Sequence, residues 1–396
     1  MDVDVVVAEV ASAVGLAEGP AGVRDVLRVI AHHEPVAARE VGRLAELPVP
    51  IVAAVCNELR KRGVVDRARP VRLTAEGRAE LAMPAAGRPG ISGECPGCGG
   101  TGVAVPPGLA ALARELERAA AGMPPARLEL DQTHCTVDTK IRRVLRMHEA
   151  GALAGQRVIV LGDDDLISLA IAAFAALPAA APPRRLTVVD CDPDLLGYLS
   201  ERVAGGRVPV ELVEHDLRQP LPAGLLGAFD VACTDPPYTA AGAELFLSRA
   251  VAALADGAGR HVFFSFGARR PDETLRTQRL IADLGLTVRS LVPGFNSYAG
   301  AGILAGTSHL YHLRTTEGAR PVITGAHAGP LYTAETRAAA TRPYRCTGCG
   351  AVHQVGPGAR WSAIAQLKAA GCPDCGGTVL RPMALRGAGA RPAAGR

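Results

Sequence analysis

Seven short apolar runs, rich in β-branched residues, lie along residues 157–314 and alternate with helical stretches. The runs read RVIVL, RLTVVD, VPVELVE, FDVACT, HVFFSF, LTVRSLV and SHLYHLR. Buried strands that alternate with helices form a doubly wound α/β sheet. The last two runs are joined by the loop FNSYAGAGILAGT rather than by a full helix, which predicts an antiparallel pair at one edge of the sheet.

The number and spacing of these runs are typical of a class I methyltransferase-like Rossmann domain, which we place at residues 157–315. The loop after its first strand reads GDDDL, where a dinucleotide site has a glycine-rich phosphate loop. Asp163, Asp164 and Asp165 would repel a pyrophosphate. One of them can cap the following helix, and Asp164 or Asp165 has the favoured place before Leu166. The others need a cation, such as a metal ion, a polyamine or a sulfonium.

Ligands of such a sheet bind at the carboxyl ends of its strands, so the residues after the next strands are candidates as well. Asp190 and Asp192 follow the second strand, where an acidic side chain accepts hydrogen bonds from ribose hydroxyls. His215 and Asp216 follow the third strand, where they are placed to meet an adenine edge. Together with Gly162, these residues form the expected nucleoside side of the site.

The fourth strand runs into DPPYT, residues 235–239. This turn resembles the one with which amino-group methyltransferases hold an attacking nitrogen: Asp235 accepts a hydrogen from the amine, and Tyr238 packs over it. Pro236 and Pro237 stiffen the turn, so the acceptors are in place before the substrate binds. An amine is protonated in water, so a carboxylate must take its proton during attack. The expected catalytic residues are Asp163, Asp164, Asp165, Asp235 and Tyr238. The expected cofactor-binding residues are Gly162, Asp190, Asp192, His215, Asp216, Pro236 and Pro237.

Residues 1–83 are typical of a winged helix, with three helical patterns followed by two short strands. The helices are expected at 21–31, 37–46 and 50–61, and the strands at 64–67 and 70–73. Arg60, Lys61 and Arg62 end the third helix and suit phosphate contacts. Winged helices also serve as dimerisation or substrate-covering modules, and both interpretations stay open.

The remaining segments connect these parts. A knuckle, ECPGCGGTG, and helices at 107–121 and 138–150 are expected within residues 84–156. Residues 316–343 are rich in Gly, Pro, Ala and Thr, which predicts a linker with little regular structure. Residues 382–396 are of low complexity and are expected to be a disordered tail.

Six of the ten cysteines form three C-x2-C pairs, a spacing that indicates metal binding more often than disulfides in a cytosolic chain. Four thiolates within residues 344–381 match a tetrahedral zinc site and predict a structural zinc ribbon; they are Cys346, Cys349, Cys372 and Cys375. Cys95 and Cys98 are only half a site. His134 and Cys135, or the same pair in a second subunit, would complete it, and a glycine-rich turn with two free thiols fits equally well.

The composition excludes a strongly polycationic protein, because 43 Lys and Arg against 39 Asp and Glu leave a net charge of only +4. The N-terminal sequence MDVDVVVAEV has neither a basic region nor a cleavage site of small residues, and no window is long and apolar enough for a membrane span. We therefore expect a soluble, cytoplasmic protein with no membrane partner.

The motif pair GDDDL and DPPYT resembles that of the branched-chain polyamine synthases, the N(4)-bis(aminopropyl)spermidine synthases. Similar segments are DQTHCTVDT at 131–139, RVLRMHEAG at 143–151 and FNSY at 295–298. The resemblance covers roughly residues 1–314. It implies transfer of aminopropyl groups from decarboxylated S-adenosylmethionine to spermidine, twice at the central nitrogen, with release of methylthioadenosine. The four-cysteine unit is not part of this family pattern, so another acceptor amine or a single transfer also fits. We further expect a homodimer.

Two other functions fit parts of the pattern. A DPPY-type methyltransferase acting on nucleic acid would bind it with the winged helix and the zinc ribbon, but an acidic rim repels phosphates. A transcriptional regulator that senses polyamines would keep the fold without turnover. Such a regulator needs no pre-placed proton acceptor at Asp235, so the intact motifs favour an enzyme.

Overall fold

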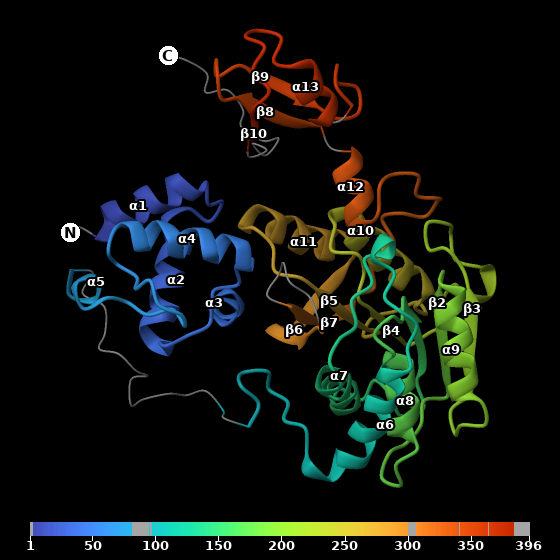
Figure 1. The fold of residues 1–396 in the computed structure, drawn as a ribbon. Helices are drawn as coiled ribbons and strands as arrows, with labels where there is room; N and C mark the ends of the chain where they lie inside the picture. Colours follow the sequence, from blue (N-terminus) through green and yellow to red (C-terminus); the bar gives the residue numbers. More distant parts are fainter. Residues whose placement is uncertain are drawn as a thin grey trace. The chain divides into compact units, whose positions relative to one another are not determined.

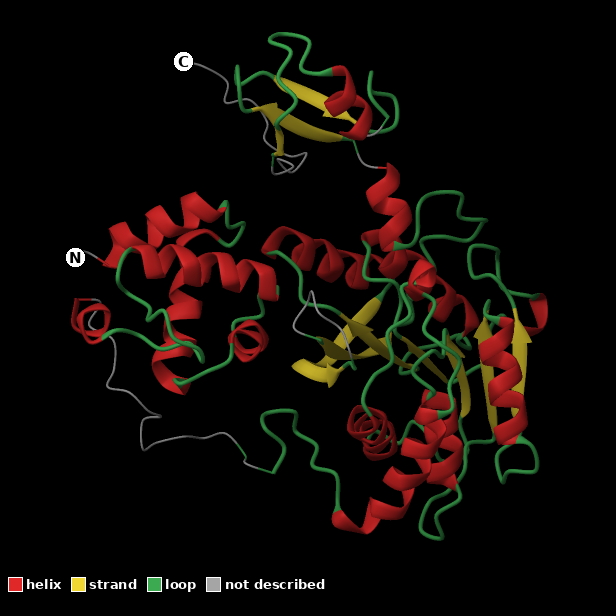
Figure 2. Cartoon of the chain, in the orientation of Figure 1, coloured by secondary structure: helices red, strands yellow, loops and turns green. Residues whose placement is uncertain are grey.

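The chain folds into two compact units, Met1–Gly329 and Pro330–Arg396. Figure 1 follows the chain by colour, and Figure 2 distinguishes helices from strands. The computed structural model describes residues 3–80, 95, 97–299, 306–339, 341–362 and 364–383.

The first unit contains a seven-stranded sheet in the order β3-β2-β1-β4-β5-β7-β6. Strands β1 to β5 pair in parallel, whereas β7 is antiparallel to both β5 and β6. The expected Rossmann sheet with an antiparallel edge pair is therefore confirmed. The strands are β1 (Arg157–Leu161), β2 (Arg185–Asp190), β3 (Val210–Glu214), β4 (Val231–Thr234), β5 (His261–Phe266), β6 (Leu286–Ser297) and β7 (Thr307–Thr315).

Helices cover both faces of this sheet, with α7 and α8 on one face and α10 and α11 on the other (Figure 1). Apolar side chains of β1 and β2 are fully buried beneath α7 and α8, which fixes the helices against the sheet. The helices are α6 (Ala110–Ala121), α7 (Val137–Glu149), α8 (Ile167–Ala175), α9 (Pro193–Val203), α10 (Ala240–Ala253) and α11 (Pro271–Asp283), with short 3-10 turns at Pro107–Leu109, Leu128–Leu130 and Ala223–Leu225.

Three helices near the carboxyl ends of the strands start at a capping side chain. Thr136 Oγ1 accepts the Thr139 N–H at 3.3 Å at the start of α7, and Thr239 Oγ1 accepts the Gly242 N–H at 2.8 Å at the start of α10. Asp192 Oδ1 accepts the N–H groups of Asp194 and Leu195 at the start of α9. A cap satisfies amides that the helix leaves unpaired, so these positions direct the loops above the sheet.

The N-terminal part of the first unit is helical and has its own apolar core. Its helices are α1 (Val3–Val14), α2 (Gly19–His33), α3 (Ala38–Leu44), α4 (Val49–Lys61) and α5 (Ala75–Glu80). Three of them match the expected patterns, but α1 was not expected, and the two strands occur only as the isolated bridges Val36–Val71 and Val65–Leu73. The winged helix therefore stays a prediction. Among the described residues no single helix is long and apolar enough to span a membrane; α1 and α2 reach that length and hydropathy only together, across a bend of 109°.

The second unit contains a three-stranded sheet in the order β10-β8-β9, packed around a small core that includes Trp361 and Leu367. Its elements are α12 (Thr333–Ala339), β8 (Arg342–Cys346), β9 (Val352–Val355), α13 (Ile364–Ala370) and β10 (Leu380–Pro382). The expectation of little regular structure at 316–343 was wrong in part: α12 and the start of β8 lie within it, and residues 323–327, which belong to the first unit, are hydrogen-bonded to α10 and to the loop after β3. The expected disordered tail lies outside the described residues from 384 onward, as do residues 81–94 and 96, which include the first and third residues of the knuckle.

Candidate active site

The GDDD loop leaves β1 with Gly162 at φ +73° and enters α8 through Leu166 at φ +52°. This left-handed turn brings the Asp163 carboxylate under the first turn of α8. Asp163 Oδ1 accepts the N–H groups of Ile167 at 2.7 Å and Ser168 at 3.2 Å, and Oδ2 accepts the Ser168 hydroxyl. Asp163 is thus the residue that caps the helix, and the expectation that Asp164 or Asp165 would do so was wrong.

Asp165 is buried and faces the connector segment instead. Its Oδ1 accepts the Cys135 N–H at 2.5 Å, and its Oδ2 accepts Arg143 Nη1 at 2.6 Å. The fully buried Lys140 ammonium donates to the Asp165 carbonyl at 2.6 Å. Burial raises the pKa of Asp165, but the charges of Arg143 and Lys140 outweigh it and hold the pKa at about 2. Asp165 is therefore charged at neutral pH, with its counter-charges supplied by the chain.

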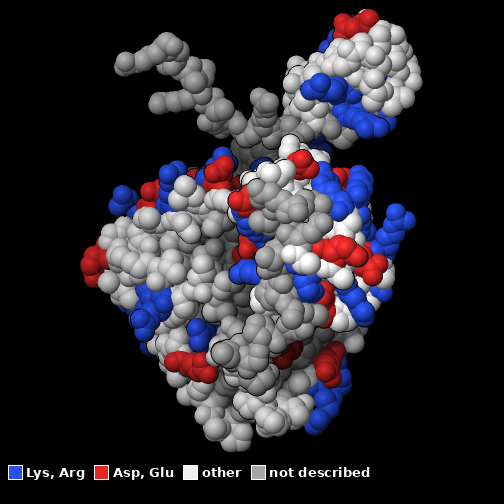
Figure 3. Space-filling view, turned by 90° about the vertical axis from the view of Figure 1, so that its left-hand side faces the viewer, with Lys and Arg blue, Asp and Glu red and all other residues white. Residues whose placement is uncertain are grey.

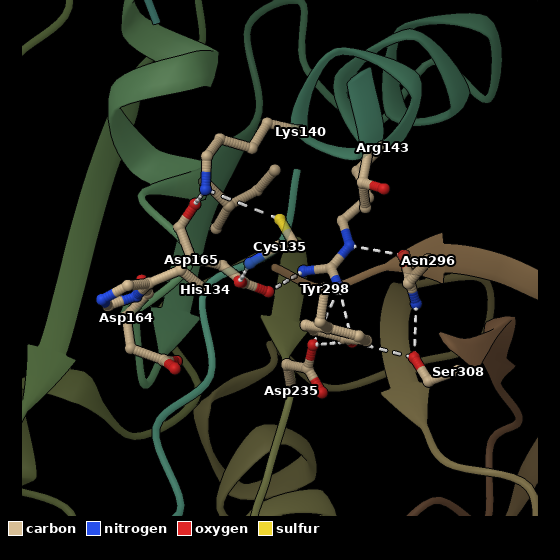
Figure 4. Close-up of polar contacts among 12 residues, drawn as sticks. His134, Cys135, Lys140, Arg143, Asp164, Asp165, Asp235, Asn296, Tyr298 and Ser308 are labelled. Atoms are coloured by element: carbon tan, nitrogen blue, oxygen red, sulfur yellow. Dashed lines mark hydrogen bonds and ion pairs between the residues drawn. The ribbon is translucent and has the colours of Figure 1, made fainter. Parts of the chain in front are cut away.

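Arg143 is the centre of the site (Figure 4). It reaches from α7 to the ends of three strands: Nη1 pairs with Asp165, Nη2 with Asp235 Oδ2 at 2.7 Å, and Nε donates to Asn296 Oδ1 at 2.7 Å. Nη2 also lies 3.1 Å from the Tyr298 hydroxyl. Sequence reasoning missed Arg143, Asn296 and Tyr298. The signal was present, because these residues lie in the segments RVLRMHEAG and FNSY of the family resemblance.

Asp235 follows β4 and shares its Oδ2 between Arg143 and the Tyr298 hydroxyl, which donates at 2.5 Å. Burial raises the pKa of Asp235 to about 7, against the opposing charge of Arg143. Tyr238 donates its hydroxyl to Tyr298 at 2.8 Å, and its ring lies edge-on to the rings of Phe266 and Tyr298. Burial also raises the pKa of Tyr298 well above its usual range, so its hydroxyl stays protonated.

Asp164 is the aspartate of the loop with the fewest partners among the described residues. Its Oδ2 accepts the Thr133 N–H at 3.0 Å, and its carbonyl oxygen lies 2.8 Å from His134 Nδ1. Burial raises the pKa of Asp164 well above its usual range, and the charges of Asp165 and Asp235 add to the rise. Asp164 and Asp235 thus have a raised pKa beside the charged Asp165–Arg143 pair, and burial also raises the pKa of Asp163, to about 7, and that of Asp190.

The residues expected on the nucleoside side also come together at this edge. Asp190 accepts the N–H groups of Asp163 and Asp192, both at 2.9 Å, and Asp192 accepts the side-chain amide of Gln132 at 2.9 Å. His215 donates its backbone N–H to the Asp190 carbonyl at 2.9 Å.

The three remaining expected residues lie after β3 and β4. The Asp216 side chain is exposed and accepts the Arg218 N–H at 2.9 Å. Pro236 and Pro237 are buried beneath the turn after β4. Every residue expected on the rim therefore follows one of the strands β1 to β4, where the sheet topology brings those strand ends together.

In the second unit the four expected cysteines form one cluster, in which all sulfur atoms lie within 4.8 Å of one another. Cys346 Sγ is 3.5 Å from Cys375 Sγ, and Cys349 Sγ is 3.6 Å from Cys372 Sγ. His353 Nε2 lies 3.1 Å from Cys372 Sγ. These separations suit four thiolates around a tetrahedral ion.

Cys95 and Cys98 remain half a site. Among the described residues, no His, Cys, Asp or Glu side chain joins them in a group of three. The suggested partners are engaged in the active site: His134 with the Asp164 carbonyl, and Cys135 with Asp165 and Lys140. Within this chain, His134 and Cys135 therefore do not complete the pair.

The strand order, the capped loops and the acidic rim define a methyltransferase-like Rossmann enzyme. Residues 111–319 match the family described as the branched-chain polyamine synthase A C-terminal domain. The chain belongs to the branched-chain polyamine synthase family.

Relatives cover most of the chain. An uncharacterized protein of Methanocaldococcus jannaschii is 33% identical over 350 residues, which are 88% of this chain and 86% of that protein. N(4)-bis(aminopropyl)spermidine synthase of Thermus thermophilus is 33% identical over 305 residues, 75% of this chain and 82% of that enzyme. A crystal structure of the branched-chain polyamine synthase from Thermus thermophilus, in complex with N4-aminopropylspermidine and 5′-methylthioadenosine, matches with a TM-score of 0.68 and 27% identity, covering 84% of this chain and 97% of that chain.

Proposed function

We propose that this chain transfers aminopropyl groups from decarboxylated S-adenosylmethionine to a polyamine such as spermidine and releases methylthioadenosine. The observation that carries the proposal is the Asp165–Arg143–Asp235 arrangement. It occurs in a fold that, in the Thermus thermophilus enzyme, is seen with N4-aminopropylspermidine and 5′-methylthioadenosine. Family membership and the intact GDDD and DPPY loops support the same reaction.

The reaction needs one base and a means of holding a cation. The acceptor nitrogen attacks the carbon next to the sulfonium, a C–N bond forms, and the C–S electron pair moves to sulfur, which leaves as a neutral thioether. The proton of the nitrogen passes to Asp235, whose pKa of about 7 suits a group that must be ionised before attack and protonated after it. Tyr298 and Arg143 hold the Asp235 carboxyl in place, which lowers the cost of orientation.

The three aspartates of the GDDD loop have different roles in this proposal. Asp163 caps α8, and Asp165 anchors Arg143, so both position the site. Asp164 has an oxygen to spare for an ammonium group of the donor or the polyamine, and Tyr238 packs beside that amine. Figure 4 shows the Asp164 and Asp235 carboxyl groups on the same side of the Arg143 guanidinium.

The donor nucleoside would bind along the ends of β1 to β3, against Gly162, Asp190, His215 and Asp216. Each carboxylate oxygen of Asp190 accepts one backbone N–H and has a second lone pair for a ribose hydroxyl. His215 Nε2 is buried and has no hydrogen-bond partner in the described part of the chain, as expected for an atom that awaits a ligand. Asp192, Pro236 and Pro237 support these loops from below.

The charge on one face of the molecule does not favour a nucleic acid as the substrate. On the face that Figure 3 shows, Lys and Arg side chains are interspersed with Asp and Glu. A nucleic-acid groove would need a run of positive charge along the phosphates.

The proposed reaction can be tested by mass spectrometry of mixtures that contain decarboxylated S-adenosylmethionine and putrescine, spermidine or spermine. We expect methylthioadenosine together with an amine that has gained one or two aminopropyl groups. The number of groups gained identifies single or double transfer. Methylation of an oligonucleotide by S-adenosylmethionine, with no aminopropyl product, would instead establish the methyltransferase alternative.

The pH dependence should report on Asp235. Below its pKa of about 7 this carboxyl is protonated and cannot accept a proton, so kcat/KM should fall about tenfold for each pH unit below that value. Acceptors with different amine pKa values make the control: an inflection due to the acceptor moves with the acceptor, whereas that of Asp235 does not. A kcat/KM that is constant between pH 5 and pH 8 would contradict the assignment.

The cysteine cluster would hold a structural zinc ion, with all four positions taken by thiolates. We expect one zinc per chain by elemental analysis of the purified protein and almost none in Cys372→Ser. The free energy of metal binding contributes to folding, so that variant should also lose the melting transition of the second unit. Cys56→Ser, which changes a buried cysteine of α4, should keep its zinc. A parent protein that contains no zinc would refute the site, and two zinc ions would implicate Cys95 and Cys98.

A further inference from the structure

Arg249 is a buried cation that has no carboxylate partner among the described residues. It lies in α10 and is only 1% exposed. Its guanidinium donates to four backbone carbonyl oxygens: Nε to Leu217 at 3.0 Å, Nη1 to Ile323 at 3.1 Å, and Nη2 to Arg218 at 3.3 Å and Gly325 at 2.7 Å. A buried charge is tolerated only when its donors are satisfied, so this arrangement depends on all of these carbonyls being held in place.

The four carbonyls belong to two segments that are far apart in the sequence. One is the loop after β3, residues 215–221, here called the β3 loop. The other is residues 323–327, here called the strap, which lies beyond residues 111–319 of the family match. The strap has two further bonds: the Ile323 N–H donates to Ser248 Oγ at 3.2 Å, and the His327 N–H donates to the Arg218 carbonyl at 2.7 Å. Arg249 and the strap therefore hold the β3 loop against α10.

The β3 loop is also joined to the nucleoside side of the site. Its first residue, His215, donates a backbone N–H to the Asp190 carbonyl at 2.9 Å, and its Nε2 is the buried atom without a partner described above. A shift of the loop at Leu217 and Arg218 would move His215 and Asp216 relative to Asp190. Asp164 and Asp235 lie in other loops, and in the described part of the chain the Arg249 guanidinium donates to carbonyls of the β3 loop and the strap instead.

We propose that Arg249 and the strap position the β3 loop for the nucleoside end of the aminopropyl donor, an inference that rests on the proposed function. Arg249 touches no reacting atom and is a positioning residue. Contacts with a nucleoside are made equally before and during the chemical step, so their loss raises the KM and Kd of the donor side and leaves kcat nearly unchanged.

The test compares Arg249→Lys, Arg249→Met and His327→Pro with the parent. Calorimetry gives the Kd for methylthioadenosine, which needs no turnover, and steady-state kinetics give the donor KM and kcat. We expect both Kd and KM to rise about tenfold in Arg249→Met, with kcat within about twofold. Arg249→Lys should lie between, because three ammonium donors cannot serve four carbonyls. His327→Pro removes the N–H to Arg218 together with the imidazole but leaves every donor of Arg249 in place, and it should show the same pattern at about threefold.

Arg157→Met is the matched control. Arg157 lies in the same unit and pairs with Asp230 at the amino ends of β1 and β4, whereas the site lies at their carboxyl ends. Its loss should therefore leave Kd, KM and kcat unchanged. Folded variants of Arg249 and His327 with a parental Kd, or with a reduced kcat at an unchanged Kd, would overturn the inference. If the Arg249 variants do not fold, His327→Pro decides by itself. A parent that binds methylthioadenosine without transferring aminopropyl groups refutes the proposed reaction but leaves the Kd comparison valid; a parent that does not bind it refutes both.

Discussion

Replacing Asp235 with asparagine should lower kcat by about 10²–10⁴-fold and leave the Kd for methylthioadenosine within about threefold of the parent value. Asparagine keeps an oxygen in the place where Asp235 Oδ2 meets Tyr298 and Arg143, so the turn after β4 should hold its shape. The amide cannot take up the proton of the acceptor nitrogen, and the attack then has no base. Single-turnover rates with saturating donor and spermidine measure the chemical step directly.

Asp230→Asn is the control for this experiment, because Asp230 precedes β4 as Asp235 follows it. Asp230 pairs with Arg157 and Arg260 at the far end of the strand. Its loss should weaken folding without slowing the chemical step. If Asp235→Asn turns over at a near-parental rate, Asp235 is not the base, and Asp164 becomes the first residue to test.

Replacing Arg143 with methionine should abolish transfer and lower the free energy of unfolding by about 3–5 kcal/mol, because the change removes the ion-pair partner of the buried Asp165 and Asp235 carboxyl groups. The parent side chain is 7% exposed and pairs with both Asp165 and Asp235. Arg143→Lys keeps one charge but not the planar fork, so it should recover part of the stability and little of the activity. Urea unfolding followed by circular dichroism gives the free energies.

The pH dependence of this loss has a defined sign. Arg143 helps to depress the pKa of Asp165 to about 2, and a depressed pKa stabilises the folded state above the unfolded pKa of the carboxyl. The difference between parent and Arg143→Met should therefore be largest at neutral pH and shrink below about pH 4, where carboxyl groups protonate. Arg185→Met, which breaks the exposed pair with Glu211, should cost only about 0–1 kcal/mol. A loss of that size at Arg143 would contradict a central role.

Much of the catalytic fold could be predicted from the sequence, because buried parallel strands and the helices between them leave strong local patterns. All seven strands were expected, and the rim residues follow from where those strands end. The local sequence pattern predicted the wrong capping residue for α8, because a backbone turn changes which aspartate lies beneath the helix. Leu166 adopts a left-handed conformation, so the chain reaches the first turn of α8 with Asp163, rather than Asp164 or Asp165, beneath its amides.

The cations of the site could not be found in this way. Acidic residues cluster in sequence at GDDD and are conspicuous, whereas their partners Lys140 and Arg143 lie in a helix of ordinary amphipathic pattern. Pairing between Arg143 and Asp235 joins positions in different elements, and only the packing of α7 on the sheet brings them together. The expected cationic ligand was thus only part of the answer, since the protein itself neutralises Asp165. The strap was missed for a similar reason: a Gly- and Pro-rich composition does not reveal that Arg249 binds its carbonyls.

The position of α7 also determines where recombination could join a different N-terminal module to the catalytic domain. A fragment that starts at β1 would contain every strand of the sheet and every aspartate of the rim, yet it would lack Arg143, Lys140 and the Thr136 contact to the end of β6. Recombination that exchanges N-terminal modules between relatives would therefore have to join them upstream of residue 131, before Gln132 and Thr133 meet Asp192 and Asp164. We therefore expect residues 131–156 to stay with the catalytic sheet whenever an N-terminal module is exchanged.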